Sequence, residues 1–501
     1  MKKEDTKDVK KKYPVFRNIY LTLFLLICLF TFSCRVFKPT RYLLKTDLTL
    51  ADKYSTTISA EKLYEYLSIL ASDDFEGRET TKPGQKKAAK YLSSELEKEN
   101  IKSPLKEGYF QVFDVDITDF SDVELIINND TLTFLDNYYS FGMPINTRER
   151  NIEIVNVGYG LINNSRNDYQ GINVKDKIVL VNEGLPNSKD FSLAEGSWRS
   201  KLANAKKEGA KAIIVQKNNY SETDSRIKEH IKYPIMKMHS QQKIKEHIPV
   251  FFVDQNFIYK ETDQLFASYS TNVSSIATAE NVLSFIKGKT EEVIVISAHY
   301  DHIGYDQGLI CNGADDDGSG TASLLSIAKA FQLAHNDGHV PYRNILFLMV
   351  SGEEKGLFGS DFYTKNPVFP LDKTMADLNI DMIGRKDTVQ NDDNYIYLIG
   401  SDKESKDLHI LNEQINNEYV GFRLDYTYNS LTDPNQFFYR SDHYNFAKHN
   451  IPVIFYFGGL HEDYHKPTDE VEKIDFSKLE KTTRYIFLTA WELAYRKKEI
   501  K

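Results

Sequence analysis

The chain has 501 residues, of which 41% are hydrophobic and 27% are charged, the balance of an ordinary globular protein. This length predicts two or three domains. The 63 basic and 72 acidic residues give a formal net charge of -9. An acidic chain argues against a general nucleic-acid binder, because phosphate contacts need clustered Lys and Arg. The three cysteines exclude a disulfide scaffold.

The N-terminal segment has the pattern of a secretion signal. A polar, basic stretch precedes an almost wholly apolar run over residues 19–32, which is short for a membrane-spanning helix of about 20 residues. The run ends at Ser33-Cys34. A small residue followed by cysteine resembles a bacterial lipoprotein signal, which implies a lipidated Cys34, although Thr31 and Phe32 depart from the usual pattern.

The alternative is an uncleaved single-span anchor. Both interpretations export the body of the protein to the cell envelope, on the periplasmic or outer side of the membrane. We therefore expect a signal peptide over residues 1–33 and a tether over residues 34–57.

The remaining chain alternates strand-like and helical patterns, which predicts an α/β fold. A first helix is expected over residues 85–98. The middle of the chain has the pattern of a separate unit, with a helix ended by Gly209 and without a cluster of His, Cys and acidic residues. We interpret it as a structural or substrate-shaping insertion. Its expected strands are 152–157, 177–181, 212–215 and 249–253, and its expected helix is 202–208.

From residue 281 onward, continuous apolar runs predict strands that are covered on both faces. The expected strands are 293–296, 344–350, 378–380 and 452–456, and the clearest helix is 321–331. Acidic and histidine residues follow each strand. They are His299 and Asp301 after the first, Glu353 and Glu354 after the second, Asp381 after the third, and His461, Tyr464 and His465 after the fourth. An acidic loop with Asp315, Asp316 and Asp317 opens the helix.

This joint pattern predicts a metal site. Sites in open α/β sheets form at the carboxyl ends of strands, and carboxylate with imidazole, without thiolate, suits Zn²⁺. Three consecutive aspartates repel one another unless a cation is present. Each fragment alone has an ordinary structural explanation, such as a helix cap for the acidic loop. Together the fragments favour a metal centre.

These motifs resemble the M28 zinc aminopeptidases, a family of hydrolases with two co-catalytic metals. The resemblance covers nearly the whole exported body. Residues 70–78 are similar to the opening of the catalytic domain, and the motifs from His299 to His465 follow the family's order and spacing. The insertion at 140–260 resembles the protease-associated (PA) domain.

The resemblance implies a phosphorylase/hydrolase-like zinc exopeptidase domain, built from residues 58–139 and 261–501. Its central sheet is mixed, mostly parallel and flanked by helices, and it carries an inserted β-rich PA domain at 140–260.

The resemblance also implies the metal ligands. His299 and Asp381 bind one zinc ion, and Glu354 and His465 bind the other. The family pattern Gly-Ala-x-Asp-x-x-Ser-Gly places the shared ligand on Asp316, which spacing alone leaves open among the three aspartates.

The same resemblance implies two further roles. Asp301 orients His299, and Glu353 is the general base for a water activated by two metals. Tyr464 either donates a hydrogen bond to the oxyanion or packs as an aromatic residue. Neither His302 nor His461 is needed to complete the metal ligands. The run Ser441-Asp442-His443 suggests a serine triad only superficially, because contiguous residues do not converge in that way. We interpret it as lining the pocket or supporting the ligands.

The resulting hypothesis is an exopeptidase that removes N-terminal residues from peptides with two Zn²⁺ ions, for which other divalent metals could substitute. Membrane attachment is expected through the N-terminal lipid anchor or signal segment. Two alternatives keep the fold, namely a carboxypeptidase and a glutaminyl cyclase. The cyclase uses a single zinc, so the full set of ligands for two metals disfavours it. A third alternative is a catalytically silent binding ectodomain.

Overall fold

The computed structural model describes residues 42–140, 146–163, 165–186, 192, 194–220, 225–239, 248–257, 264–272 and 274–500. The chain divides into residues 1–44 and residues 45–501, and every described helix and strand belongs to the second unit. The expected signal at residues 1–33 lies outside the described residues. Helix α2 (Leu48–Ser55) lies within the segment expected to be a tether. None of the helices in the described ranges is long and apolar enough to cross a membrane.

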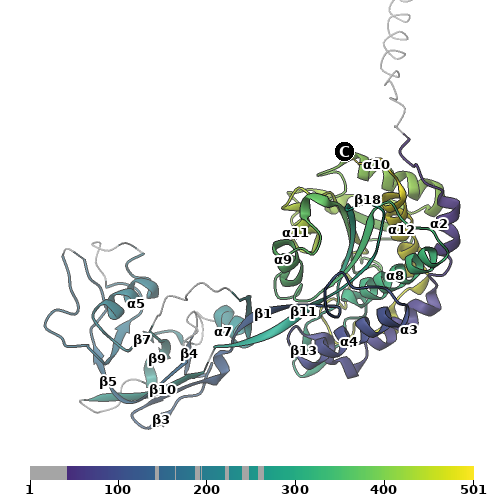
Figure 1. The fold of residues 1–501 in the computed structure, drawn as a ribbon. Helices are drawn as coiled ribbons and strands as arrows, with labels where there is room; N and C mark the ends of the chain where they lie inside the picture. Colours follow the sequence, from purple (N-terminus) through teal and green to yellow (C-terminus); the bar gives the residue numbers. More distant parts are fainter. Residues whose placement is uncertain are drawn as a thin grey trace, which may run out of the picture. The chain divides into compact units, whose positions relative to one another are not determined.

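A nine-stranded mixed sheet carries the strands that were expected to bear ligands (Figure 1). Its strand order is β18-β17-β19-β16-β12-β15-β11-β1-β8. β15, β12, β16 and β19 form a parallel centre, whereas β11 is antiparallel to β15 and β17 is antiparallel to β19. The strands are β1 (Phe110–Thr118), β8 (Ile235–Met238), β11 (Ser274–Ile286), β12 (Val293–His299), β15 (Asn344–Val350), β16 (Thr374–Asp381), β17 (Tyr395–Ile399), β18 (Arg423–Asp425) and β19 (Val453–Phe457).

Helices cover both faces of the parallel centre, which explains its continuous apolar runs. Every residue of β12, β15 and β19 is buried, as expected for strands without a solvent-facing side. On one face α8 contacts β12 and β16, and α12 contacts β12; on the other, α11 contacts β16 and β19 (Figure 1). The helices are α3 (Ala60–Leu70), α4 (Pro83–Lys98), α8 (Gly320–Asn336), α9 (Phe358–Lys365), α10 (Lys406–Ile415), α11 (His443–Ala447) and α12 (Phe476–Tyr495).

A second, eight-stranded sheet has its own apolar core, which includes Val179, Ile213 and Phe251. Its order is β3-β2-β10-β5-β6-β7-β9-β4, and the helices α5 (Trp198–Lys207) and α7 (Ser225–Ile231) lie between its strands in sequence. The strands are β2 (Val123–Ile127), β3 (Asp130–Thr131), β4 (Tyr138–Ser140), β5 (Asn146–Asn156), β6 (Ile178–Asn182), β7 (Ala212–Lys217), β9 (Val250–Asp254) and β10 (Leu265–Asn272). The sheet therefore includes strands on both sides of residues 140–260, and the domain boundaries stay a prediction.

The expected fold class, a mixed α/β domain with a second β-rich unit, is confirmed. β15 has its predicted bounds, and α8 begins one residue before the predicted helix and extends to Asn336. The sheet is mixed because β11 and β17 enter it antiparallel on either side of the parallel strands. The parallel centre is the part that positions the candidate site.

Candidate metal centre

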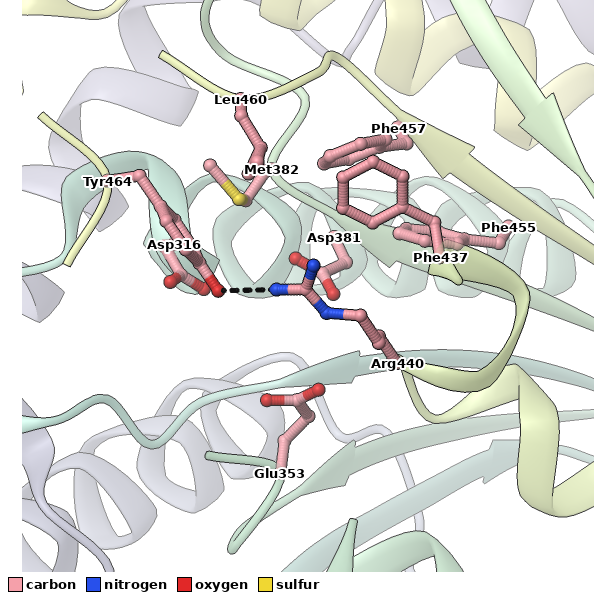
Figure 2. Close-up of a pocket in the computed structure, with 10 residues that line it drawn as sticks. All are labelled: Asp316, Glu353, Asp381, Met382, Phe437, Arg440, Phe455, Phe457, Leu460 and Tyr464. Carbon is pink, nitrogen blue, oxygen red and sulfur yellow. Dashed lines mark hydrogen bonds between the residues drawn. The ribbon is translucent and has the colours of Figure 1, made fainter. Parts of the chain in front are cut away.

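The carboxyl ends of three neighbouring strands bring the predicted residues to one edge of the sheet. β12 ends at His299, β16 ends at Asp381, and β15 leads into Glu353 and Glu354. Because β12 is parallel to both β15 and β16, the side chains that follow these strands meet at the same edge. Glu353, Asp381 and Asp316 line one pocket there (Figure 2).

Asp316 lies between two pairs of predicted ligands. Its Oδ1 is 3.3 Å from His299 Nε2, and its Oδ2 is 3.1 Å from His465 Nε2. His299 Nε2 also lies 3.7 Å from Asp381 Oδ1, and His465 Nε2 lies 3.1 Å from Glu354 Oε2. The two oxygens of Asp316 therefore face a histidine–aspartate pair and a histidine–glutamate pair. A carboxylate shared by two cations needs this arrangement.

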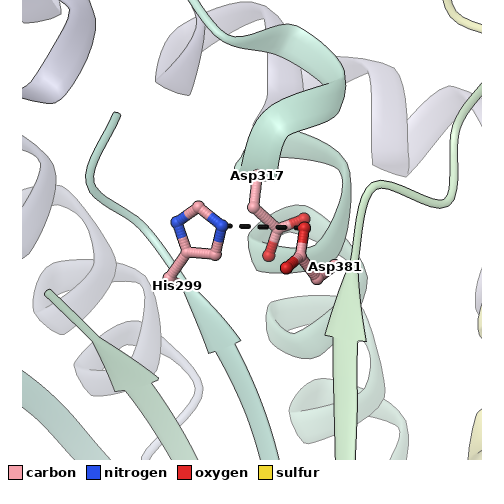
Figure 3. A group of neighbouring side chains, drawn as sticks. All are labelled: His299, Asp317 and Asp381. Carbon is pink, nitrogen blue, oxygen red and sulfur yellow. Dashed lines mark ion pairs between the residues drawn. The ribbon is translucent and has the colours of Figure 1, made fainter. Parts of the chain in front are cut away.

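Asp317 lies beside the first pair, although the sequence motifs assign it no role. His299, Asp317 and Asp381 each offer a ligand atom, and these atoms lie within 4.8 Å of one another (Figure 3). However, Asp317 Oδ1 accepts hydrogen bonds from the backbone N–H groups of Gly320, at 2.9 Å, and Met382, at 3.1 Å. Asp317 thus ties the acidic loop to the end of β16.

His302 lies beside the second pair. It forms a similar group with Asp316 and Glu354, and its Nδ1 is 3.0 Å from Glu354 Oε1. Neither ring nitrogen of His302 has a hydrogen-bond partner among the described residues. The ligand set expected from the motifs is complete without His302. The geometry nevertheless brings it as close to Glu354 as His465.

The buried polar atoms of the site fit a bound zinc ion. His299 Nε2, Asp316 Oδ2, Glu354 Oε1 and His465 Nε2 are buried, and none has a hydrogen-bond partner within the described ranges. Leaving such atoms unpaired costs free energy, and a cation would satisfy them together. Imidazole and carboxylate donors without a thiolate match the ligand preference of zinc.

The two adjacent glutamates have pKa values that are shifted in opposite directions. Burial raises the pKa of Glu353 well above its usual value, and the charge of Glu354 adds to this effect. Burial also opposes ionisation of Glu354, but the close imidazoles of His302 and His465 lower its pKa to about 2. The pKa of His465 is raised to about 10, because the nearby carboxylates of Asp316 and Glu354 outweigh its burial. The pKa of Glu354 is thus lowered and that of Glu353 is raised, although the two residues are adjacent.

A buried arginine fixes the entrance to the acidic loop. Arg78 donates hydrogen bonds to the carbonyl oxygens of Leu70 at 2.7 Å, Tyr300 at 2.8 Å, Asn312 at 2.6 Å and Gly313 at 2.9 Å. These oxygens come from the end of α3, the residue after His299 and the start of the acidic loop. The motif at residues 70–78 therefore has a structural role, because it holds the loop that carries Asp316.

Asp469, to which the sequence motifs give no role, holds the same loop from the other side. Its carboxylate accepts the backbone N–H groups of Asp315 at 3.0 Å and Asp316 at 3.2 Å. Asp469 follows His465 by four positions, a spacing that does not by itself indicate this role. His461 lies close by, with Nε2 at 3.3 Å from Asp315 Oδ2. The last ligand-bearing loop thus supports the acidic loop.

Asp301 contacts His299 mainly through its backbone. His299 Nδ1 is hydrogen-bonded to the carbonyl oxygen of Asp301 at 3.1 Å, whereas the Asp301 carboxylate lies 3.8 Å from Nδ1. That carboxylate accepts hydrogen bonds from the Thr80 hydroxyl, at 2.7 Å, and the backbone N–H of Glu353, at 3.3 Å. Asp301 therefore connects the ends of β12 and β15, and its orienting role stays a prediction.

The run Ser441-Asp442-His443 is not arranged as a triad. Ser441 donates a hydrogen bond of 2.7 Å to Asp381, and Asp442 accepts one of 2.5 Å from Ser360. The ring of His443 stacks on Phe455 with a centroid separation of 4.9 Å. The three side chains thus have different partners, and Ser441 supports a predicted metal ligand.

Comparison with known protein families identifies two segments of the chain. Residues 281–490 match the model of peptidase family M28, and residues 151–260 match the model of the PA domain. The part of the chain that carries the candidate site is therefore a peptidase family M28 domain. The members of this family are hydrolases. The residues matched to the PA domain supply part of β5 and all of β6, β7 and β9 in the second sheet, whereas β8, within the same range, belongs to the nine-stranded sheet.

Two relatives and one solved structure illustrate the similarity. Aminopeptidase YwaD of Bacillus subtilis is 24% identical over 352 residues, which cover 64% of this chain and 68% of the relative. A probable leucine aminopeptidase of Arthroderma otae is 29% identical over 222 residues, which cover 43% of this chain and 58% of the relative. The solved structure of an aminopeptidase from Aneurinibacillus sp. strain AM-1 superposes with a TM-score of 0.52 at 21% identity, covering 90% of this chain and 97% of that one, and shows the same fold.

The pocket of this M28 peptidase adjoins the predicted ligands and has mainly apolar walls (Figure 2). It opens to solvent, and the space between its walls, open solvent included, is about 330 Å³. Arg440 projects into it and donates a hydrogen bond of 3.4 Å to the hydroxyl of Tyr464. No motif in the sequence points to Arg440. The pocket is lined by Asp316, Glu353, Asp381, Met382, Phe437, Arg440, Phe455, Phe457, Leu460 and Tyr464.

Proposed function

We propose that this M28 peptidase is a zinc aminopeptidase that removes single residues from the free N-terminus of peptides. One observation carries the proposal: the two oxygens of Asp316 face His299 at 3.3 Å and His465 at 3.1 Å. Two metal sites that share a carboxylate account for this placement. The relatives named as aminopeptidases support the choice of the peptide end.

In this proposal five residues hold two zinc ions. His299 and Asp381 hold one ion, Glu354 and His465 hold the other, and Asp316 is shared. Bound zinc polarises the scissile carbonyl and makes water a stronger acid. The buried donor atoms without hydrogen-bond partners support this assignment.

Two further residues handle protons at the reacting centre. Glu353 takes the proton of the attacking water and passes it to the leaving amine. The burial and neighbouring charge that raise its pKa suit a group that must hold a proton between these steps. Burial and the charge of Asp316 raise the pKa of Tyr464, so its hydroxyl keeps its proton and can donate a hydrogen bond to the developing oxyanion.

A pair of peptides tests the proposal on the full chain. An unblocked peptide and its N-acetylated twin are incubated with the protein, with chelator, and with chelator followed by zinc, and the products are weighed by mass spectrometry. We expect stepwise loss from the free N-terminus only, abolished by chelator and restored by zinc.

Other outcomes contradict the proposal in different ways. Loss from the C-terminus of both peptides would indicate a carboxypeptidase at the same site. If the peptides stay intact while two zinc ions are bound, the proposed metal centre would stand, but the proposal that peptides are the substrates would be wrong. Intact peptides without bound zinc after reconstitution would favour a binding ectodomain.

We also propose that the protein is exported and anchored through Cys34. The apolar run at residues 19–32 followed by Ser33-Cys34 supports this. Mass spectrometry of the protein expressed in a bacterial host tests it, with Cys34→Ala as the comparison. We expect a lipid-modified N-terminus in the membrane fraction that is absent from the variant. An unmodified chain that retains Met1 would contradict the proposal.

A further inference from the structure

We propose that Arg440 is a specificity-determining residue that selects substrates with a carboxylate on, or next to, the residue being released. This inference rests on the proposed function and concerns the pocket beside the reacting centre. The carboxylate belongs either to the side chain of an N-terminal Asp or Glu, or to the C-terminus of a short peptide.

The pocket lies where a substrate residue must sit. Three of its lining residues, Asp316, Glu353 and Asp381, belong to the proposed metal and proton-transfer groups. A peptide whose carbonyl is next to these groups therefore places its first side chain, or its next residue, in the same space. The walls around that space are aromatic and aliphatic, and Arg440 is the basic residue among those that line it (Figure 2).

Arg440 has few interactions for a guanidinium with five N–H donors. It contacts the Tyr464 hydroxyl at 3.4 Å, a long hydrogen bond, and the ring of Phe437, whose centroid lies 4.9 Å from Cζ. In the described parts of the chain, no carboxylate forms an ion pair with it. Arg385 provides a contrast, because it pairs with Asp463 at 2.7 Å.

These two contacts position the guanidinium without neutralising it. The aromatic ring holds one face of the planar group, and Tyr464 accepts from one edge. The remaining N–H donors are available to a ligand that enters the pocket. A carboxylate matches that planar fork with two parallel hydrogen bonds, which is the preferred pairing of arginine.

The same charge disfavours other substrates. A basic N-terminal side chain would bring like charges together in a partly enclosed space. An apolar side chain of similar size would fit the walls but would displace water from the guanidinium without replacing its hydrogen bonds. A neutral amide is the closest comparison, because Gln differs from Glu in charge while keeping its shape.

Ratios of kcat/KM test the proposal on the zinc-loaded full chain. The first pair is the chromogenic anilide of Glu against that of Gln, which share a blocked C-terminus. The second pair is the dipeptide Leu-Gly against Leu-Gly-amide, which share an apolar first residue. We expect the acid of one pair to be preferred by about tenfold or more, and the pair that discriminates identifies the source of the carboxylate.

Variants then assign the preference to Arg440. Arg440→Met is expected to bring the discriminating ratio close to one, whatever it does to the overall rate. Arg440→Lys keeps the charge but loses the fork, so we expect an intermediate ratio. Lys448→Met is the matched control: it removes an exposed positive charge eight positions along the chain, outside the pocket lining, and the ratio should not change.

Three outcomes would overturn the inference. The wild-type protein could turn over both members of each pair equally, or it could discriminate while Arg440→Met keeps the same ratio. In both cases the aminopeptidase proposal would survive. Absence of turnover of all four substrates and of the unblocked peptide would defeat the proposed function, and this inference with it.

Discussion

Ser441 donates a hydrogen bond of 2.7 Å to Asp381 Oδ2 and accepts one of 2.8 Å from Asn379 Nδ2. Asn379 Oδ1 in turn accepts a hydrogen bond from the Ser297 hydroxyl at 3.0 Å. All four side chains are buried. A series of hydrogen-bonded polar side chains inside the sheet therefore holds Asp381 Oδ2. The other carboxylate oxygen, Oδ1, lies 3.7 Å from His299 Nε2. Ser441 fixes the orientation of a proposed metal ligand.

Replacing Ser441 should weaken metal binding. Ser441→Ala removes the hydrogen bond to Asp381, and supporting partners of this kind typically change metal affinity about tenfold or more. Competition between the protein and a chromogenic zinc chelator measures the change. The exposed Ser430 provides a control, since Ser430→Ala removes only surface hydrogen bonds with the hydroxyl and the backbone N–H of Thr432. Equal zinc affinities for wild type and Ser441→Ala would show that Asp381 is not a ligand oriented by Ser441.

Replacing Glu353 should separate metal binding from turnover. Glu353→Gln keeps the shape of the side chain but cannot accept the proton of water, so we expect kcat to fall by about 10²- to 10⁴-fold. Zinc content, measured by elemental analysis, should stay at the wild-type value because Glu353 holds no metal in the proposal. Glu462→Gln changes an exposed glutamate and should keep the wild-type rate. A Glu353→Gln variant with near-normal kcat would refute the assigned mechanism.

The sequence predicted the elements whose pattern is local. β12, β15 and β19 are continuous apolar runs because both of their faces are buried. β1 has no such pattern, since its burial alternates irregularly and it pairs with β11, about 170 positions away. Its place in the sheet depends on a partner that local periodicity does not identify. This distant pairing also makes the sheet more mixed than the parallel strands alone suggest.

The candidate site likewise contains some residues that the sequence identifies and others that only the fold reveals. His299, Glu354 and Asp381 could be selected because each follows a recognisable strand. The roles of Arg78 and Asp469 depend on which carbonyl and N–H groups the fold brings to them, and a lone arginine or aspartate carries no such information. Arg440 follows three aromatic residues, a pattern that indicates packing rather than a pocket. Only the assembled walls reveal that its guanidinium faces the site.

Replacing Arg78 should weaken the fold around the acidic loop. Arg78→Met leaves four buried carbonyl oxygens without their donor, and we expect a loss of about 3 kcal/mol or more in the free energy of unfolding. Urea unfolding in the presence of zinc measures it. Lys90→Met on the exposed side of α4 is the control and should change stability by less than about 0.5 kcal/mol.

Zinc affinity provides a second readout for Arg78. Because Arg78 holds the residue before the acidic loop, the variant should also bind zinc more weakly than wild type. A variant that unfolds at the wild-type urea concentration and binds zinc normally would show that the four hydrogen bonds do not hold the loop.

A comparable buried cation, Lys201, lies on a helix beside the eight-stranded sheet. Lys201 on α5 donates hydrogen bonds to the carbonyl oxygens of Tyr159 at 2.8 Å, Asn182 at 2.8 Å and Gly184 at 2.7 Å. Burial lowers the pKa of Lys201 to about 8, against the opposing effect of the charges of Asp168 and Glu183, so the side chain remains mostly an ammonium at neutral pH. Lys201 therefore joins α5 to the loops at the ends of β5 and β6.

Lys201→Met should loosen this junction locally. Three partly buried carbonyl groups lose a charged donor, which we expect to cost about 3 kcal/mol, equivalent to about a 100-fold rise in local opening. Hydrogen exchange followed by mass spectrometry should show faster exchange in α5 and β6 and unchanged exchange in β12. The exposed Lys207, on the same helix, provides the control through Lys207→Met. Equal protection of α5 in wild type and Lys201→Met would mean that apolar packing, rather than the ammonium, joins the helix to the sheet.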